Sequence, residues 1–442
     1  MDRRKLVAET LADALLAGTA DVEGFVARTS WVLGRRHRWL APFCKRVFRR
    51  FGSSLDQRNR STLVEWIRHD AGYDGAFLAR RTPRIAHYLL DPPRMAPRKG
   101  ALAACALPDL PTPGDLAAWL GITATELDWF ADVHALNPAH GPLSHYRYVW
   151  VPKSYGARLM EVPKPRLREI QRRILRGILD PIPVHRAAHG FRQGKSCRTY
   201  AEPHVGRDMV LKLDLRDFFP SIPGARIHAL FATLGYPDGV ARLLTGLCTN
   251  AVPQAIARRG AASWLAAKRL AVPHLPQGAP TSPALANLCA LHLDLRLDEL
   301  ARSMGGQYTR YADDLAISGG LAVRRRAASL SGLVAAIAIE EGFEINHRKT
   351  RAMPRSHRQL LTGVVVNERP NVRREDFDRL KAILTNCVRH GPASQNRHAE
   401  RDFRSHLAGR IAHVASLNWE RGKKLQEIFR RIEWGTGDQS RG

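Results

Sequence analysis

Residues 307–318 of the chain read QYTRYADDLAIS. Short segments of strand-forming residues flank Asp313 and Asp314, which predicts a β-hairpin with both acids at its tip. Adjacent carboxylates repel each other, and a fold tolerates them readily when a divalent cation neutralises their charge. The stretch therefore predicts a metal site on a hairpin turn.

A third carboxylate is expected upstream, because such a cation needs more oxygen ligands than one turn supplies. Residues 210–215 read VLKLDL, and this alternation predicts a buried strand that ends at Asp214. The turn-like residues 218–221 follow it. Two strand ends carrying Asp214, Asp313 and Asp314 can then hold two ions between them.

Three motifs follow one another along the chain, namely DLRDFF at 214–219, QGAPTSP at 277–283 and YADD at 311–314. Their order and rough spacing are those of reverse transcriptases, and the chain resembles the bacterial retron-type enzymes over about residues 146–370. The resemblance implies an RNA-directed DNA polymerase. It also implies an α+β fold, the right-hand polymerase architecture of fingers, palm and thumb, preceded here by a helical N-terminal extension.

The composition indicates a soluble protein with a polyanionic partner. The 442 residues are 44% apolar, and we find no uninterrupted apolar run of the ~20 residues that cross a membrane. A formal charge of +28, from 69 Lys and Arg against 41 Asp and Glu, favours a phosphate backbone as the partner. The N-terminal residues lack the apolar segment of an export signal, so we expect a cytoplasmic protein that does not bind membranes. The six cysteines stand singly, which predicts reduced thiols rather than a zinc site or disulfides.

Charge and proline content divide the chain into four expected segments. Residues 1–100 form a basic helical extension that we expect to help hold RNA. Residues 101–146 contain no Lys or Arg and form a linker and helical lead-in. By the resemblance, residues 147–370 form fingers and palm, and residues 371–442 form a helical, RNA-binding thumb.

The resemblance assigns roles to individual residues of the expected site. The metal-binding and catalytic carboxylates are Asp214, Asp313 and Asp314, which would bind two Mg²⁺ ions, with Mn²⁺ as a substitute. Lys349 is the expected catalytic lysine that stabilises or protonates the leaving pyrophosphate. The expected nucleotide-binding residues are Lys153, Arg158, Phe219, Gln277 and Gly278, and the expected primer grip includes Thr362 and Gly363. Phe219 matches the ring that excludes a 2'-hydroxyl, whereas Asp217 matches a position outside the metal set.

Two further stretches carry local expectations. Residues 189–196 read HGFRQGKS and match a family signature, whose small residues we expect to admit the template backbone. Pro283 predicts a helix start, with a helix running from Ala284 to Leu293.

The retron resemblance implies a structured non-coding RNA as template and primer, deoxynucleotide triphosphates as substrates and a short RNA-linked DNA as product. It also implies, in many members, an effector protein and a role in antiphage defence. Retron enzymes carry Asn-Ala-x-x-His upstream of the Gln-Gly turn, but here Gln254 stands where the histidine would be. They also carry Val-Thr-Gly where this chain has Leu361-Thr362-Gly363.

Two other classes of function remain open from the residues alone. One is another prokaryotic reverse transcriptase, from a group II intron, a diversity-generating element or an abortive-infection system. The other is a non-catalytic RNA-binding scaffold, against which the intact Asp214, Asp313 and Asp314 argue.

Overall fold

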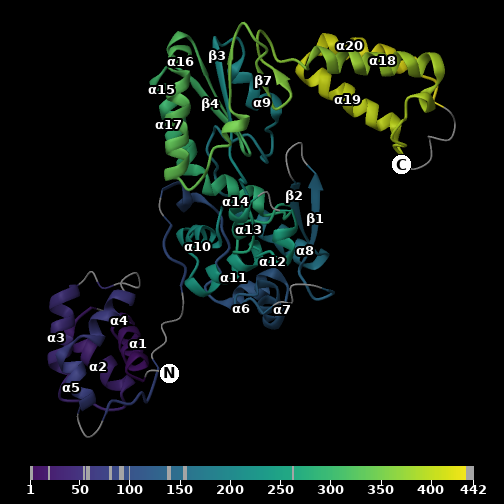
Figure 1. Cartoon of the computed structure of the whole chain (residues 1–442). Coiled ribbons are helices and arrows are strands. Elements are labelled where there is room, and N and C mark those ends of the chain that lie inside the picture. The colour runs from purple at the N-terminus through teal and green to yellow at the C-terminus, as the bar shows by residue number, and fades with distance from the viewer. Residues whose placement is uncertain are drawn as a thin grey trace. The chain divides into compact units, whose positions relative to one another are not determined.

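The computed structural model describes residues 3–17, 20–52, 55, 60–78, 82–88, 94–98, 100–136, 141–152, 157–260 and 263–434. The chain divides into two compact units, Met1–Arg94 and Met95–Gly442, and each is described by itself (Figure 1). Helices and strands are mixed in the second unit, as the predicted α+β class requires.

The first unit is helical. Its helices are α1 (Arg3–Leu16), α2 (Val22–Val32), α3 (Leu40–Phe51), α4 (Arg60–Arg68) and α5 (Ala71–Leu78). They bury apolar side chains at helical spacing, as α3 does with Leu40, Phe43, Cys44 and Val47. The N-terminal unit therefore has a hydrophobic core of its own.

The second unit begins with helices and a β-hairpin. The elements are a 3₁₀ turn at Gly100–Ala104, α6 (Pro113–Leu120), α7 (Ala124–Ala131), β1 (Tyr146–Pro152), β2 (Ala157–Pro163) and α8 (Pro165–Ile174), which continues as a π-helical turn, Leu175–Leu179. Helices α6 and α7 each start with a capping box, in which Thr112 pairs with Asp115 and Thr123 with Glu126. Strands β1 and β2 pair antiparallel from Tyr146–Pro163 to Pro152–Ala157.

A four-stranded antiparallel sheet carries the predicted acids. Its strands are β3 (Met209–Asp214), β4 (Gln307–Tyr311), β5 (Asp314–Gly319) and β6 (Arg351–Pro354), in the spatial order β4-β5-β3-β6. The register pairs Asp214 with Asp314. The predicted strand ending at Asp214 and the predicted hairpin thus lie side by side, with their acids at one edge of the sheet.

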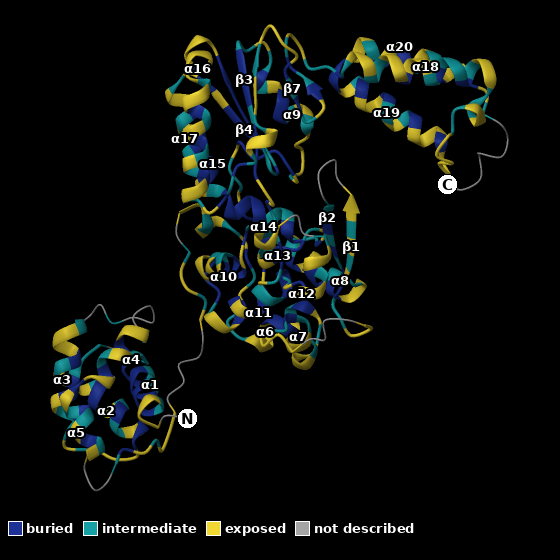
Figure 2. Ribbon diagram, viewed as in Figure 1, coloured by how far each residue is buried: buried dark blue, intermediate teal, exposed yellow. Residues whose placement is uncertain are grey.

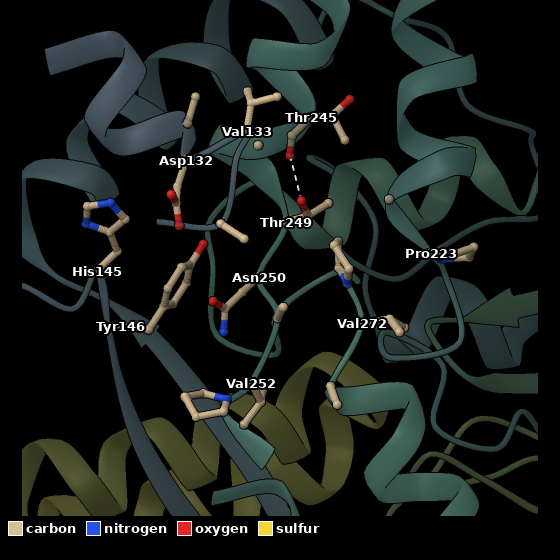
Figure 3. Close-up of a pocket in the computed structure, with 18 of the residues that line it drawn as sticks. Asp132, Val133, His145, Tyr146, Pro223, Thr245, Thr249, Asn250, Val252 and Val272 are labelled. Atoms are coloured by element: carbon tan, nitrogen blue, oxygen red, sulfur yellow. Dashed lines mark hydrogen bonds between the residues drawn. The ribbon is translucent and has the colours of Figure 1, made fainter. Parts of the chain in front are cut away.

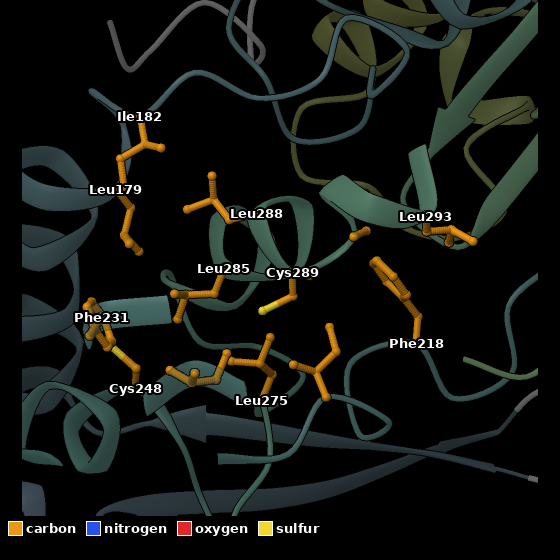
Figure 4. Packing of buried hydrophobic residues seen from close by; sticks show 14 of the residues in the cluster. Leu179, Ile182, Phe218, Phe231, Cys248, Leu275, Leu285, Leu288, Cys289 and Leu293 are labelled. Atoms are coloured by element: carbon orange, nitrogen blue, oxygen red, sulfur yellow. The ribbon is translucent and has the colours of Figure 1, made fainter. Parts of the chain in front are cut away.

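Alternation along these strands divides the core into two parts. Leu211, Leu213 and Ile317 point into the larger apolar cluster. Helices α10 (Gly224–Thr233), α11 (Asp238–Cys248), α14 (Ser282–Cys289) and α15 (Leu291–Ser303) complete this cluster (Figure 4). Val210 and Ala316 point to the opposite side and join a second cluster that reaches into the C-terminal helices. Figure 2 shows buried stretches, coloured dark blue, along the sheet and along the neighbouring helices.

Helices surround the sheet and connect its strands. They are α9 (Cys197–Ala201), α10 (Gly224–Thr233), α11 (Asp238–Cys248), α12 (Gln254–Gly260), α13 (Trp264–Leu270), α14 (Ser282–Cys289), α15 (Leu291–Ser303), α16 (Leu321–Arg325) and α17 (Ala327–Glu340), with 3₁₀ turns at Glu202–His204 and His347–Lys349. The expected single helix from Ala284 to Leu293 is wrong, because Ala290 leaves the helical conformation, at φ −85° and ψ 6°, and separates α14 from α15.

The C-terminal part consists of a small hairpin and a helical bundle. Strands β7 (Leu360–Leu361) and β8 (Val364–Val365) precede α18 (Arg374–His390), a 3₁₀ turn at Pro392–Ser394, α19 (Phe403–Leu417) and α20 (Trp419–Arg430). A Cβ added at Gly422 would lie 2.5 Å from the Ala415 Cα, so only glycine allows α20 to approach α19 this closely.

Among the described residues, no helix combines the length and the apolar content needed to cross a bilayer.

Candidate active site

The predicted acids lie where two pairs of strands end. Ala312 and Asp313 form the turn between β4 and β5, and the Leu215 amide donates to the Asp313 carbonyl at 2.8 Å. Asp214 ends β3 directly opposite Asp314. Main-chain hydrogen bonds of the sheet therefore fix the relative positions of the three carboxylates.

Their charges are compensated unequally. The Lys349 Nζ donates to Asp214 Oδ2 at 2.8 Å, and Lys212 Nζ lies 3.0 Å from Asp314 Oδ1. Burial, and then the charges of Asp314 and Asp214, raise the pKa of Asp313. A cation bound beside Asp313 would relieve this cost of holding the carboxylate ionised.

The acids fit divalent cations in donor chemistry, and they form an open arrangement rather than a closed cage. In the part of the chain that the structure describes, no three acidic, His or Cys side chains converge into a ready metal cluster. Asp214 and Asp313 line one cavity, whereas Asp314 points to Lys212 and accepts a hydrogen bond from the Thr362 hydroxyl at 3.2 Å. Asp214 and Asp313 thus present oxygen donors of the kind that hard divalent cations prefer, and a substrate would have to bring the remaining ligands.

A buried arginine supports the turn. The Arg310 guanidinium is 0% exposed and donates Nε and Nη2 to the two Asp294 oxygens at 2.8 and 2.7 Å. Its Nη1 donates to the Asn287 Oδ1 at 3.0 Å and to the Ala312 carbonyl at 3.2 Å. Ala312 has a φ of +55°, which costs an L-residue energy, so these bonds help to hold a strained turn in place.

A glycine from another segment packs on the same turn. A Cβ at Gly190 would lie 2.6 Å from the Ala312 amide nitrogen, closer than real Cβ contacts allow. The Asn287 Nδ2 donates to the Gly190 carbonyl at 2.9 Å. Gly190 therefore packs against the main chain of the Ala312–Asp313 turn, and the role of this signature in admitting the template backbone stays a prediction.

A cavity of about 240 Å³ opens beside the acids. The predicted residues that line it are Asp214, Asp313, Lys349, Arg158, Phe219 and Gln277. Arg158 lines the cavity, and its buried Nε has no hydrogen-bond partner among the residues that the structure describes. The Phe219 ring lies 6.1 Å from the Phe191 ring, centroid to centroid, and both rings face the cavity.

The remaining predicted residues are not among those that line this cavity. Lys153 falls outside the described residues. Gly278, at φ +128°, does not line the cavity; a Cβ there would come within 3.0 Å of the Glu161 carbonyl. Thr362 and Gly363 both have positive φ and form the two-residue turn between β7 and β8, from which the Thr362 hydroxyl reaches Asp314.

A buried ion pair, which the sequence analysis did not identify, fixes the β1–β2 hairpin beside this cavity. Glu161 on β2 and His274 are both 0% exposed, and the His274 Nε2 lies 2.9 Å from Glu161 Oε1. The Asn250 Nδ2 donates to Glu161 Oε2 at 2.7 Å. The Glu161 amide donates to the Gln277 carbonyl at 2.8 Å, which links the hairpin directly to the Gln277 loop.

A larger cleft of about 960 Å³ lies apart from the acids (Figure 3). Its walls come from segments 130–135, 144–148, 223–228, 242–254 and 271–273. The predicted site residues that the structure describes do not line it. Chemistry rather than size therefore identifies the site, since Asp214, Asp313, Arg158 and Lys349 all line the smaller cavity.

Comparisons with known proteins agree with this geometry. Residues 151–366 match the family described as "Reverse transcriptase (RNA-dependent DNA polymerase)". The chain is 42% identical to the retron Mx65 reverse transcriptase of Myxococcus xanthus over 335 residues, which is 75% of this chain and 74% of that protein. It is 35% identical to the retron Mx162 reverse transcriptase of the same organism over 389 residues, which is 85% of this chain and 77% of that protein. It is 30% identical to the retron Ec86 reverse transcriptase of Escherichia coli over 272 residues, which is 61% of this chain and 75% of that protein.

Proposed function

Because the chain belongs to the retron reverse transcriptases and is thus an RNA-directed DNA polymerase, we propose that it copies a cognate structured non-coding RNA into a short, RNA-linked single-stranded DNA. The observation that carries the proposal is the meeting of Asp214 and Asp313 with Arg158 and Gln277 at one cavity. Ligands for cations and donors for phosphate are adjacent there, as nucleotidyl transfer requires.

The parts of the second unit take polymerase roles in this proposal. The β1–β2 hairpin and the helices around it act as fingers, and the four-stranded sheet with α15 and α17 acts as the palm. The bundle α18–α20 acts as the thumb and holds the RNA, whose duplex parts are recognised by shape, phosphates and 2'-hydroxyls. The boundaries are residues 147–370 for fingers and palm and 371–442 for the thumb.

The reaction joins a primer hydroxyl oxygen to the α-phosphorus of a deoxynucleotide and breaks the bond to the pyrophosphate oxygen. Reverse transcriptases use divalent metal ions, and we propose two Mg²⁺, replaceable by Mn²⁺, held by Asp214 and Asp313 with Asp314 at the periphery. Such ions lower the pKa of the attacking hydroxyl and neutralise charge on the leaving group.

The side chains of the cavity orient the nucleotide. The Arg158 guanidinium binds a phosphate oxygen through its free Nε, and Lys153 adds a point charge. Gln277 lines the pocket on the side of the loop that β2 anchors, with Gly278 giving the loop its close approach to β2. Lys349, which is 55% exposed, exchanges its bond to Asp214 for the departing pyrophosphate and supplies a proton to it.

Phe219 selects the sugar. Its half-buried ring packs on Phe218, with centroids 5.5 Å apart, and lines the cavity. A 2'-hydroxyl would collide with this ring, so the pocket rejects ribonucleotides through steric exclusion. Thr362 and Gly363 position the primer end through the bond from Thr362 to Asp314.

The cellular setting completes the proposal. The protein acts in the cytoplasm, with its RNA serving as both template and primer. A retron effector protein is a further partner, and the RNA–DNA product acts with it in antiphage defence.

The test is to sequence the nucleic acid that co-purifies with the protein expressed together with its native flanking DNA. The wild type is compared with the double variant Asp313→Asn and Asp314→Asn. The matched control carries Asp128→Asn and Asp238→Asn, two exposed acids of the same unit that do not line the cavity.

A short DNA joined to one discrete RNA in the wild type and the control, and absent from the double variant, supports the proposal. Heterogeneous DNA copied from many RNAs would refute the retron product. RNA bound equally by all three proteins, without any DNA, would refute catalysis.

A further inference from the structure

Helix α3 of the N-terminal unit has one strongly basic and acid-free face. Its residues 40–51 read LAPFCKRVFRRF and include no Asp or Glu. Its apolar side chains are buried against the unit, while Lys45, Arg49 and Arg50 are exposed. The loop before it adds the exposed Arg36 and Arg38.

These five cations have no ion pair with any residue that the structure describes. Three acids of the unit pair with other basic residues instead: Asp70 binds Arg46 through two bonds of 2.8 Å, Asp13 binds Arg60 at 2.6 and 2.9 Å, and Asp74 pairs with Arg4. These pairs leave the exposed cations of α3 and its preceding loop uncompensated by any described residue.

We propose that this basic face, formed by Arg36, Arg38, Lys45, Arg49 and Arg50, is a second RNA-binding site that docks the phosphate backbone of the structured RNA. The inference rests on the proposed function, because it takes that RNA as the polyanion. It adds an RNA contact outside residues 151–366, which match the polymerase family.

The geometry of the helix suits a phosphate row. Lys45 and Arg49 are four residues apart, hence about 6 Å along the axis on the same face. The helix runs for 12 residues, roughly 18 Å, a length over which a nucleic-acid strand presents several phosphates. Four of the five cations are arginines, whose forked donors bind phosphate oxygens in pairs.

A membrane surface is the poorer occupant of this face. A helix that lies on a bilayer buries an apolar face in the lipid. In α3 the side chains of Leu40, Phe43, Cys44 and Val47 are fully buried in the unit, Ala41 and Phe51 are partly buried, and Phe48 is 39% exposed. The basic face therefore offers positive charge but little apolar surface that could insert into a bilayer.

The test uses the full-length protein with two triple variants of equal charge. One carries Arg38→Gln, Lys45→Gln and Arg49→Gln on the basic face. The control carries Arg3→Gln, Lys5→Gln and Arg84→Gln, exposed residues on or near α1, which packs against α2 and α4. Binding is measured with an RNA duplex of about 20 base pairs, comparable to the span of double-stranded RNA modules, between about 50 and 200 mM salt. Vesicles of phosphatidylcholine and phosphatidylserine serve as the alternative probe.

Each lost phosphate contact lowers the slope of log K against log salt by about 0.7 to 0.9. We expect the basic-face variant to lose about two units of slope and to bind RNA roughly 10- to 100-fold more weakly at low salt. The control should bind like the wild type, and both variants should extend a generic primer on an RNA template at the wild-type rate.

Equal RNA affinity and slope in the two variants would overturn the proposal, as would loss of vesicle binding with RNA binding intact. The two claims can fail separately. A wild type that does not polymerise refutes the proposed function, whereas an active enzyme whose RNA binding ignores the basic face refutes only this inference.

Discussion

Replacing Arg310 by lysine tests how the turn at Ala312 and Asp313 is held in place. The substitution keeps a positive charge beside the buried Asp294, so no carboxylate is left uncompensated. It removes the several N–H donors of the planar guanidinium, because one ammonium nitrogen cannot reach Asp294, the Asn287 Oδ1 and the Ala312 carbonyl together.

The magnitude follows from the acceptors that lose a donor. The Nη1 bonds to Asn287 and Ala312 disappear, and each buried acceptor left unpaired costs about 1 to 3 kcal/mol. We therefore expect the free energy of unfolding to fall by about 2 to 6 kcal/mol. The released turn should misplace Asp313, and a displacement of about 1 Å costs roughly 100-fold in kcat.

The assay has two readouts and a matched control. Urea unfolding gives the stability, and primer extension at a temperature where the variant is fully folded gives kcat and the KM for the nucleotide. Arg186→Lys is the control, since Arg186 also binds an acid, Asp298, but is 70% exposed and should change stability by about 0.5 kcal/mol or less.

The expected pattern is a lower kcat with an unchanged nucleotide KM, because Arg310 acts on the turn and touches no substrate. A folded Arg310→Lys enzyme with wild-type kcat would refute the idea that this arginine positions Asp313. A rise in KM alone would place its role in the nucleotide pocket.

Three further predictions address single contacts. Gly190→Ala should lower kcat roughly 10- to 100-fold, because the added Cβ would displace the Ala312 backbone. The control Gly239→Ala, which has nothing within 4 Å of the added Cβ, should be as active as wild type. Equal activity of the two variants would contradict the tight contact between Gly190 and Ala312. Phe219→Ala should raise ribonucleotide incorporation relative to deoxynucleotide incorporation on the order of 10- to 100-fold in single-nucleotide extension, and unchanged selectivity would show that the ring is only structural. Burial, and then the charges of Arg207 and His189, lower the pKa of His204 to about 3, so the unfolded chain binds a proton below pH 6.5 that the native state does not. The free energy of unfolding, measured by urea titration, should therefore fall by about 2 kcal/mol between pH 6.5 and pH 5. The His204→Gln variant should lose this part of the pH dependence. If the unfolding free energies of the two proteins change equally with pH, His204 is not the group responsible.

The sequence predicted the strands and acids because both depend on local patterns. The alternation of residues 210–215 is a local signal, and so is the run of apolar residues around the adjacent Asp313 and Asp314. The structure pairs Asp214 with Asp314 and brings Asp313 to the same cavity.

The supporting networks could not be predicted, because their partners are far apart in the chain. Arg310 meets Asp294 at a separation of 16 residues, and Glu161 meets His274 at 113. A signal was present, since a charged residue within an otherwise buried strand must find a partner. The identity of that partner depends on packing, which the sequence does not reveal.

The most direct test of the central claim is primer extension on an RNA template by purified wild type and Asp313→Asn. Loss of the carboxylate should lower kcat roughly a thousandfold or more, because it removes several kcal/mol of transition-state stabilisation. The raised pKa of Asp313 predicts that the variant is at least as stable as wild type, since asparagine removes a repelled charge. A stable Asp313→Asn protein that extends primers at the wild-type rate would contradict the assignment of this turn as the polymerase active site.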